Sequence, residues 1–269
     1  MAKKKILFIN QEISPYVDDT HLSIMGRELP RAIQERGHEI RTFMPKWGTI
    51  NERRGMLHEV QRLSGMNLII DDTDHPLIIK VASIPAARMQ IYFIDNDDFF
   101  ARKASILDPE TGAPCDDNDE RAIFFARGVM ETTKKLRWVP DVIHLQGWFT
   151  MMVAVFSRLF YRDDPAFSKA KIVVSLYADS FEGEWSKVAD KLWIEGIDEA
   201  ALEQLDIHDY KSLMRAAIAA ADGVAVCEPE GVDPDLVSHA KELGKPVLDY
   251  VEDGAARAKA FSDFYASLF

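Results

Sequence analysis

Long hydrophobic runs are absent from this chain of 269 residues. No stretch approaches the roughly twenty apolar residues that a membrane-spanning helix needs. Three lysines, Lys3, Lys4 and Lys5, precede an apolar run at residues 6–9, but that run ends at Asn10. Because the apolar core of a secretory signal needs roughly seven to fifteen residues, the sequence predicts a cytoplasmic protein without a membrane segment.

Positive charge is also in short supply. The chain has 32 Lys and Arg residues against 44 Asp and Glu residues, which gives a formal net charge of −12. Proteins that bind the phosphate backbone of nucleic acids usually carry a basic patch or stripe. The charge balance therefore argues against a nucleic-acid partner.

Cysteine is scarce too, and the familiar cofactor motifs are missing. Cys115 and Cys227 lie far apart, without the spacing of metal ligands, so we expect free thiols that are buried or incidental. The chain has no G-x-G-x-x-G, phosphate-binding loop, nucleophile elbow or H-E-x-x-H. The acidic clusters at residues 71–74, 95–98 and 116–120 lack the spacing of a calcium loop and are typical of turns and helix N-caps. No cofactor or metal is predicted.

What the chain does have is an alternation of short apolar runs with amphipathic segments, the pattern of parallel β-α-β units. With 47% hydrophobic residues, it can form a substantial core. Pro30 should kink or break the first helix. We expect strands at residues 6–9, 40–44, 142–145, 172–175, 224–227 and 247–250, and helices near residues 22–36, 118–136, 149–160, 210–221, 234–243 and 255–268.

Residues 57–94 differ from the rest, because short β-prone runs alternate there with polar turns. A local antiparallel excursion fits this pattern better than another helical crossover. The sequence therefore predicts an α/β fold with one doubly wound, mostly parallel sheet of about seven parallel strands. We expect residues 1–269 to form a single domain that includes the excursion.

Four blocks of sequence resemble the bacterial glycogen synthases and plant starch synthases. The first contains the Glu12 and Pro15 of an S-E-x-x-P motif and the Arg36-Gly37-His38 turn that follows the first helix. The third reads W-x-P-D-V-I-H and ends at His144. The blocks occur in the family's order and span most of residues 4–230. They lie at residues 11–45, 94–125, 138–144 and 220–229.

The resemblance implies a Rossmann-like half of a GT-B glycosyltransferase, in which two such domains face each other across a cleft. Enzymes of this family transfer glucose from ADP-glucose or UDP-glucose to the non-reducing end of an α-1,4-glucan, with retention of configuration. Their second domain holds most of the nucleotide sugar. This chain ends at Phe269, about where that domain should begin, so we expect the N-terminal half alone.

The departures from the family pattern fall on the chemistry. The family's K-T-G-G loop, which serves the diphosphate, is replaced by Asp18, Asp19, Thr20 and His21. Lys has become Asp and both glycines are lost, although glycine is what lets backbone N–H groups approach a phosphate. Asp18 should therefore repel a diphosphate.

A second departure lies in the family's H-x-H-D-W-H-x-G segment. His144 and Trp148 are retained, whereas Gln146, Gly147 and Phe149 replace the second His, the Asp and the last His. A similar loss affects residues 176–183, where the family's His-Asn pair is missing. Scaffold residues match the family and polar cleft residues do not.

The residues expected to line the cleft are Asp18, His144, Trp148 and Glu182. His144 could contact a ligand or could sit, hydrogen-bonded, beneath the cleft floor. Trp148 could stack on a sugar or could serve packing. Glu182 and Glu184 form a carboxylate pair that could do acid–base work, as in glycosidases. The sequence identifies no catalytic residue.

Three functional hypotheses follow. The chain could act in α-1,4-glucan synthesis with a second chain that supplies the missing domain, without being an active glucosyltransferase alone. It could be a non-catalytic glucan- or protein-binding regulator of glycogen metabolism. It could also be an enzyme with new chemistry in the old cleft. The candidate ligands are a glucan and a nucleotide sugar.

Overall fold

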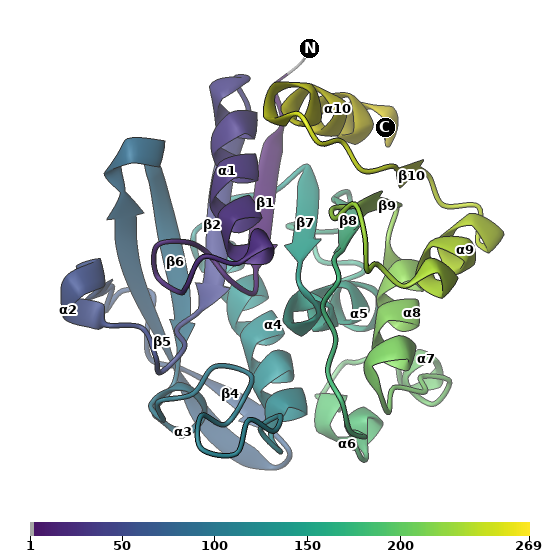
Figure 1. Ribbon diagram of the computed structural model, residues 1–269. Coiled ribbons are helices and arrows are strands. Elements are labelled where there is room, and N and C mark those ends of the chain that lie inside the picture. The colour runs from purple at the N-terminus through teal and green to yellow at the C-terminus, as the bar shows by residue number, and fades with distance from the viewer. Residues whose placement is uncertain (1–2) are drawn as a thin grey trace.

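The computed structural model describes residues 3–269, which form a ten-stranded sheet with helices packed against it (Figure 1). The strand order is β10-β9-β8-β7-β1-β2-β6-β5-β3, with β4 paired to β5. From β10 to β6 every neighbouring pair is parallel. The parallel strands are β1 (Lys5–Asn10), β2 (Glu39–Pro45), β6 (Met89–Asp95), β7 (Val142–Gln146), β8 (Lys171–Leu176), β9 (Gly223–Val226) and β10 (Val247–Leu248).

The predicted α/β fold class with a mostly parallel sheet is thus confirmed. Every residue of β7 is buried, as expected for a central parallel strand that has both faces covered. The strand at the sheet's far edge is shorter than expected, because β10 pairs with β9 only at Val247 and Leu248.

The excursion contains the antiparallel pairs of the sheet. Strand β5 (Thr73–Ile84) runs antiparallel to β6, β4 (Met66–Ile70) and β3 (His58–Glu59). In Figure 1 these strands extend away from the parallel part of the sheet. The predicted excursion, residues 57–94, includes nearly all of β6, although β6 also pairs in parallel with β2.

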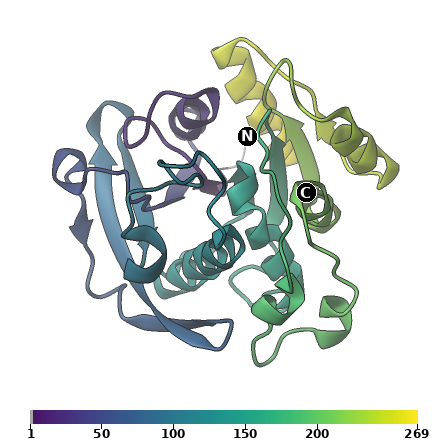
Figure 2. The ribbon, with the colours of Figure 1, turned by 60° about the horizontal axis from the view of Figure 1, so that its bottom comes forward.

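Six helices of eight residues or more pack around the sheet, with α1 against α10 and α5 between α4 and α8. Figure 2 shows α10 beside α1 at the rim of the molecule. The helices are α1 (His21–Glu35), α4 (Asn118–Lys135), α5 (Met152–Leu159), α8 (Tyr210–Ala220), α9 (Pro234–Glu242) and α10 (Gly254–Ser267).

Pro30 does not break α1. A break was one of the two alternatives, a kink or a break, that the sequence suggested. The helix continues through this residue to Glu35. Pro30 lies on the buried face of α1 together with Leu29 and Ile33. Burial of that face offsets the loss of one backbone hydrogen bond.

Five further short helices occur in loops for which the sequence offered no periodic signal, and a sixth, η2, forms the first turn of the helix predicted near residues 149–160. A segment of four or five residues is too short to display a helical repeat. They are α2 (Glu52–Gly55), α3 (Asp97–Phe100), α6 (Val188–Leu192), α7 (Glu199–Leu202) and the 3₁₀ turns η1 (Pro85–Ala87) and η2 (Trp148–Thr150).

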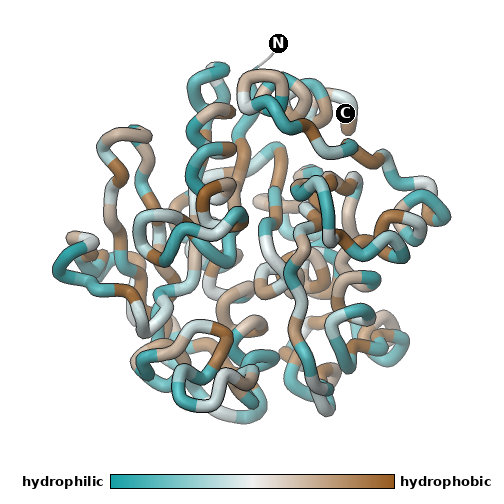
Figure 3. The backbone as a smooth tube through the Cα atoms, viewed as in Figure 1, coloured by the Kyte–Doolittle hydropathy of each residue, from teal (hydrophilic) through white to brown (hydrophobic). Residues whose placement is uncertain are grey.

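The chain reverses its direction of winding at β1. Strands β2 and β6 follow on one side of β1, and β7 to β10 follow on the other. Ligands of doubly wound sheets bind outside the carboxyl ends of the strands at such a switch point. Figure 3 shows hydrophobic residues concentrated along the strands, while the loops at their ends are mostly hydrophilic.

Candidate functional site

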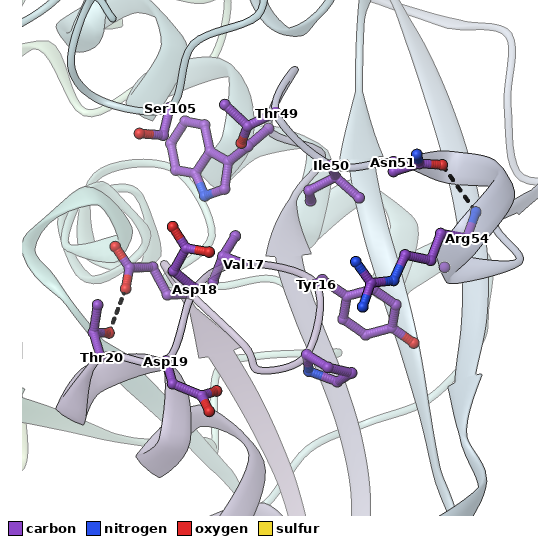
Figure 4. Close-up of a pocket in the computed structure, with 14 residues that line it drawn as sticks. Tyr16, Val17, Asp18, Asp19, Thr20, Thr49, Ile50, Asn51, Arg54 and Ser105 are labelled. Atoms are coloured by element: carbon purple, nitrogen blue, oxygen red, sulfur yellow. Dashed lines mark hydrogen bonds between the residues drawn. The ribbon is translucent and has the colours of Figure 1, made fainter.

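A cavity of about 850 Å³ opens between the β1–α1 loop and the segment that follows β2. Figure 4 shows Asp18, Asp19 and Thr20 on one side and Asn51 and Arg54 on the other. The lining residues come from three parts of the chain: Glu12, Pro15, Tyr16, Val17, Asp18, Asp19 and Thr20; Trp47, Thr49, Ile50, Asn51, Arg54 and Gly55; and Ser105.

The charge of this lining is acidic. It contains three carboxylates, Glu12, Asp18 and Asp19, against one cation, Arg54. The Asp18 carboxylate is exposed and forms no ion pair within residues 3–269. Asp19 accepts a hydrogen bond from the Ser14 hydroxyl at 2.5 Å. A diphosphate would meet repulsion at this lining.

The N-terminus of α1, a type of position that often binds anions, is occupied by the protein's own side chains. Thr20 caps the helix by accepting a hydrogen bond from the Ser23 backbone N–H at 2.9 Å, and the Ser23 hydroxyl lies 2.9 Å from the Thr20 backbone N–H. The Thr20 hydroxyl donates to Glu12 at 2.7 Å. The replaced K-T-G-G loop therefore has a self-contained hydrogen-bond network.

One wall of the cavity is anchored by a cluster of partly buried charges. Glu52 of α2 lies 2.8 Å from the Lys46 ammonium and 2.7 Å from that of Lys80. Lys80 also pairs with Asp95 at 2.8 Å. Although burial opposes the charged form, the bonds to Lys46 and Lys80 give Glu52 a lowered pKa. These pairs hold α2, and with it Arg54, against the sheet.

Tyr16 provides an aromatic surface inside the cavity. Its ring packs edge-on against Phe93, with ring centroids 4.9 Å apart. Burial raises the pKa of Tyr16 to about 12, so the hydroxyl remains a neutral hydrogen-bond donor. A fixed ring of this kind, next to carboxylates, suits a polyhydroxylated ligand.

The floor of the switch point between β1 and β7 is closed. Gly147 has a φ of +86°, and a Cβ added there would lie 2.7 Å from the Gln11 Cβ. The Gln11 side-chain oxygen accepts a hydrogen bond from the Phe149 backbone N–H at 3.0 Å. Gln11 thus fills the space that a larger residue in place of Gly147 would need.

Polar side chains below this floor form hydrogen bonds with each other. The Gln146 amide donates to Asn10 at 2.6 Å and accepts from the Tyr177 hydroxyl at 2.6 Å. All three residues are buried. A satisfied buried network of this kind specifies a rigid structure and leaves few groups to act on a substrate.

The structure does not bring the four predicted site residues together in one cleft. Asp18 lines the cavity. His144 is fully buried, and its nitrogens lie 2.6 Å from the Tyr265 hydroxyl and 2.6 Å from the Ser175 hydroxyl. Of the two alternatives for His144, the structure shows the hydrogen-bonded histidine beneath the cleft floor. Trp148 is 1% exposed, and Glu182 is exposed outside the cavity lining.

Trp148 packs within an aromatic cluster. Its ring centroid lies 4.5 Å from that of Phe181 and 5.9 Å from that of Trp185. Phe181 and Trp185 stack with centroids 4.7 Å apart. The packing role is therefore observed, because the neighbouring rings occupy the space over the indole.

Asp179 is a residue that the sequence reasoning did not select. Its carboxylate accepts a hydrogen bond from the Trp148 backbone N–H at 2.9 Å. Burial, followed by the nearby Glu228 and Glu12 carboxylates, raises its pKa to about 6. The signal was available, because Asp179 lies three residues after the end of β8, where the family pattern has changed.

The described residues offer no metal centre and no membrane anchor of helical type. Within residues 3–269, no group of three or more His, Cys, Asp or Glu side chains could hold a metal ion. No helix in that range has both the length and the apolarity to cross a bilayer. Asn96 in one acidic cluster caps α3 by accepting from the Asp98 and Phe99 backbone N–H groups.

Fold and site together define a Rossmann-like α/β sheet of the kind found in GT-B glycosyltransferases, with an acidic cavity at the carboxyl ends of β1 and β2. A family model described as the starch synthase catalytic domain matches residues 5–233. The chain belongs to this family, and the resemblance seen in the sequence is confirmed.

Individual relatives agree with this assignment. A glycogen synthase of Chlorobaculum parvum is 32% identical over 262 residues, which are 96% of this chain and 51% of that protein. One from Chlorobium limicola is 34% identical over 203 residues, 74% of this chain and 42% of that protein. The chain thus spans about half the length, or less, of these two relatives.

A solved structure supports the fold. The catalytic domain of starch synthase IV from Arabidopsis thaliana, bound to ADP and acarbose, superposes with a TM-score of 0.73 at 18% identity. The match covers 96% of this chain and 53% of that one.

Because His144 is buried, we expect the free energy of unfolding to fall at acid pH. Burial lowers its pKa from the ordinary 6.5 to about 3. Because the folded pKa is depressed, the stabilising contribution is present above the unfolded pKa and is lost as pH falls from 6.5 toward 3. We expect a loss of about 2–3 kcal/mol by about pH 4.5 from this group.

Urea unfolding at a series of pH values measures this effect. In His144→Gln the pH dependence should be shallower than in the wild type, whereas His58→Gln, at an exposed histidine, should leave it unchanged. Equal pH dependence in wild type and His144→Gln would contradict the assignment.

Proposed function

We propose that this chain binds an α-1,4-glucan segment in the cavity beside Tyr16 and Asp18 and does not by itself transfer glucose. The observation that carries the proposal is the lining, in which three carboxylates and an aromatic ring face a single cation. Carboxylates accept hydrogen bonds from sugar hydroxyls, and these charge-assisted bonds are stronger than neutral ones. We choose a glucan as the ligand because the chain belongs to the starch synthase family.

Several residues of this chain are unsuited to the transfer of glucose from a nucleotide sugar. Asp18 stands where the family has the Lys that neutralises a diphosphate, and Thr20 caps the helix whose N–H groups would otherwise face phosphate. Gln146 and Gly147 replace the polar His and Asp at the switch point, and Gln11 fills the space above Gly147. Groups that would orient a donor sugar are therefore missing from the β1–α1 loop and from the switch point, and positioning can contribute roughly 7–11 kcal/mol to catalysis.

Titration calorimetry on the 269-residue chain tests the proposal with three ligands: a maltooligosaccharide, ADP-glucose and UDP-glucose. We expect binding of the oligosaccharide only. Asp18→Ala should weaken it about tenfold, because a hydrogen bond to a charged group contributes about 1.5–3 kcal/mol. The control is Asp249→Ala, at an exposed aspartate outside the cavity lining.

Three outcomes separate this proposal from its rivals. Micromolar binding of either nucleotide sugar to the unaltered chain would favour the catalytic hypothesis and contradict ours. Incorporation of radiolabelled glucose into glycogen, above a control without protein, would do the same. Absence of oligosaccharide binding would exclude the glucan site and leave a protein-binding role.

A further inference from the structure

A buried guanidinium behind the cavity has no carboxylate partner. Arg121 of α4 is fully buried and forms no ion pair within residues 3–269. Its Nε donates to the Phe99 carbonyl at 3.0 Å, and its Nη1 donates to the Ser105 carbonyl at 2.7 Å and to the Asn118 side chain at 2.8 Å. Among residues 3–269, its Nη2 has no hydrogen-bond partner. A buried charge left this way is costly unless an anion is close.

Aromatic rings offset only part of the free-energy cost of burying the Arg121 guanidinium. The Arg121 Cζ lies 5.1 Å from the centroid of the Trp47 ring and 5.3 Å from that of Phe100. Cation–π contacts contribute about 0.5–2 kcal/mol, which is less than the cost of burying an unpaired charge. The free Nη2 therefore identifies a place where a negative group would be stabilised.

The Cys115 thiol lies next to this place. Its Sγ is 4.0 Å from the Ser105 carbonyl oxygen, the same atom that accepts the bond from Arg121 Nη1. The backbone N–H of Cys115 donates to Ile106 at 3.1 Å, which fixes the residue in the loop before α4. Cys115 is partly exposed, whereas the chain's other thiol, Cys227, is buried. A reagent from solvent can reach only the first.

The surrounding charges have both signs. Burial, followed by repulsion from Arg102, lowers the pKa of Arg121 to about 10, while Asp117 and Cys115 act in the opposite direction. Arg102 and Asp117 form an ion pair with each other. Asp116 is exposed, and the N-terminus of α4 begins at Asn118. A buried guanidinium and a helix N-terminus both stabilise a nearby negative charge, such as that of an oxidised sulfur.

We propose that Cys115 is an oxidation site for hydrogen peroxide, whose sulfenate product is held by the unpartnered Nη2 of Arg121. The inference does not depend on glucan binding. It uses a cysteine, a buried cation and the carbonyl oxygen that both contact.

The reaction balances without any group from outside the pair of reactants. The Cys115 thiolate attacks one peroxide oxygen, an S–O bond forms and the O–O bond breaks. Hydroxide leaves and takes the proton of the sulfenic acid, so the products are a sulfenate and water. The sulfur is oxidised by two electrons and the peroxide is reduced by two. The sulfenate returns to the thiol on treatment with an added low-molecular-weight thiol.

This modification would act on the cavity wall. Ser105, whose carbonyl oxygen contacts both side chains, is itself a lining residue (Figure 4). A sulfenate that draws Nη2 toward itself changes the hydrogen bonds that hold Ser105. The cavity is thereby linked to the oxidation state of a loop outside it.

The experiment compares one thiol in two states of the same chain. In Cys227→Ser, which retains Cys115 alone, the rate of peroxide oxidation is followed by trapping the sulfenate with dimedone and by peptide mass. The reference is the same chain unfolded in concentrated urea, where Arg121 no longer adjoins the thiol. We expect oxidation about tenfold faster in the folded chain.

A folded rate equal to or below the unfolded rate would overturn the proposal, because exposure alone favours the unfolded chain. Arg121→Lys, which keeps the charge but removes the Nη2 group, should lower the folded rate of Cys115. If that variant does not fold, the comparison of folded and unfolded chains still decides. Cys115→Ser should show no dimedone adduct in the folded state, since Cys227 is buried and burial raises its pKa to about 11.

Discussion

Asp18→Lys should raise the affinity of the chain for ADP by about tenfold at low ionic strength, while it abolishes oligosaccharide binding. The substitution changes the cavity lining by two charge units at a side chain that is exposed and carries no ion pair within residues 3–269. A tenfold change corresponds to about 1.4 kcal/mol. That is well below the roughly 4 kcal/mol of a unit charge pair at 4 Å near a surface, because solvent screens the site.

Calorimetry with ADP at two salt concentrations checks this result. The gain should shrink at high salt, as expected for a screened interaction. Asp249→Lys makes the same charge change away from the cavity lining and should leave ADP affinity near the wild-type value. An equal gain in both variants would show that net charge, not the cavity, attracts the nucleotide. Thr20 is left unchanged in both because it caps α1.

The second large effect concerns stability. Gly147→Ala should lower the free energy of unfolding by about 3 kcal/mol or more. The residue has a φ of +86° and a ψ of 144°, a conformation that costs an L-residue about 1–3 kcal/mol. The new Cβ would also lie 2.7 Å from the Gln11 Cβ, and overpacking costs about 1–3 kcal/mol.

Urea unfolding with a matched control separates the two causes. Gly183 has a φ of +97° with nothing within 4 Å of an added Cβ, so Gly183→Ala reports backbone strain without a clash. The difference between the two variants isolates the contact with Gln11. Should the two glycines cost the same, Gln11 would not close the floor as we describe. A double variant with Gln11→Ala should recover a small part of the loss, because it removes the Gln11 side-chain oxygen, which would lie 2.8 Å from the new Cβ, but keeps the Gln11 Cβ.

Much of the fold followed from local pattern. The apolar runs at residues 6–9 and 142–145 predicted β1 and β7 to within about a residue, because parallel strands that are buried on both faces are continuously apolar. The Gly37 after α1 was an equally direct signal, and the helix ends two residues before it.

The candidate site was predicted less well. Sequence placed His144, Trp148 and Asp18 near one sheet edge, but only Trp148 and Asp18 follow a parallel strand, whereas His144 lies in the middle of β7. It could not tell that His144 points to Tyr265, because that contact joins residues 121 positions apart in sequence. Nor could it foresee that Tyr16, Asn51 and Arg54 share a cavity with Asp18, since α2 has too few residues to show a pattern.

The central position of β1 has a consequence for synthesis on the ribosome. One edge of β1 pairs with β2, with Lys5 opposite Glu39. The other edge pairs with β7, with Ile6 opposite Val142. The first strand to emerge therefore keeps an open edge until residue 146 has left the exit tunnel. An exposed strand edge is a template for intermolecular pairing. Nascent chains stalled before β7 should accordingly be the species that chaperones retain.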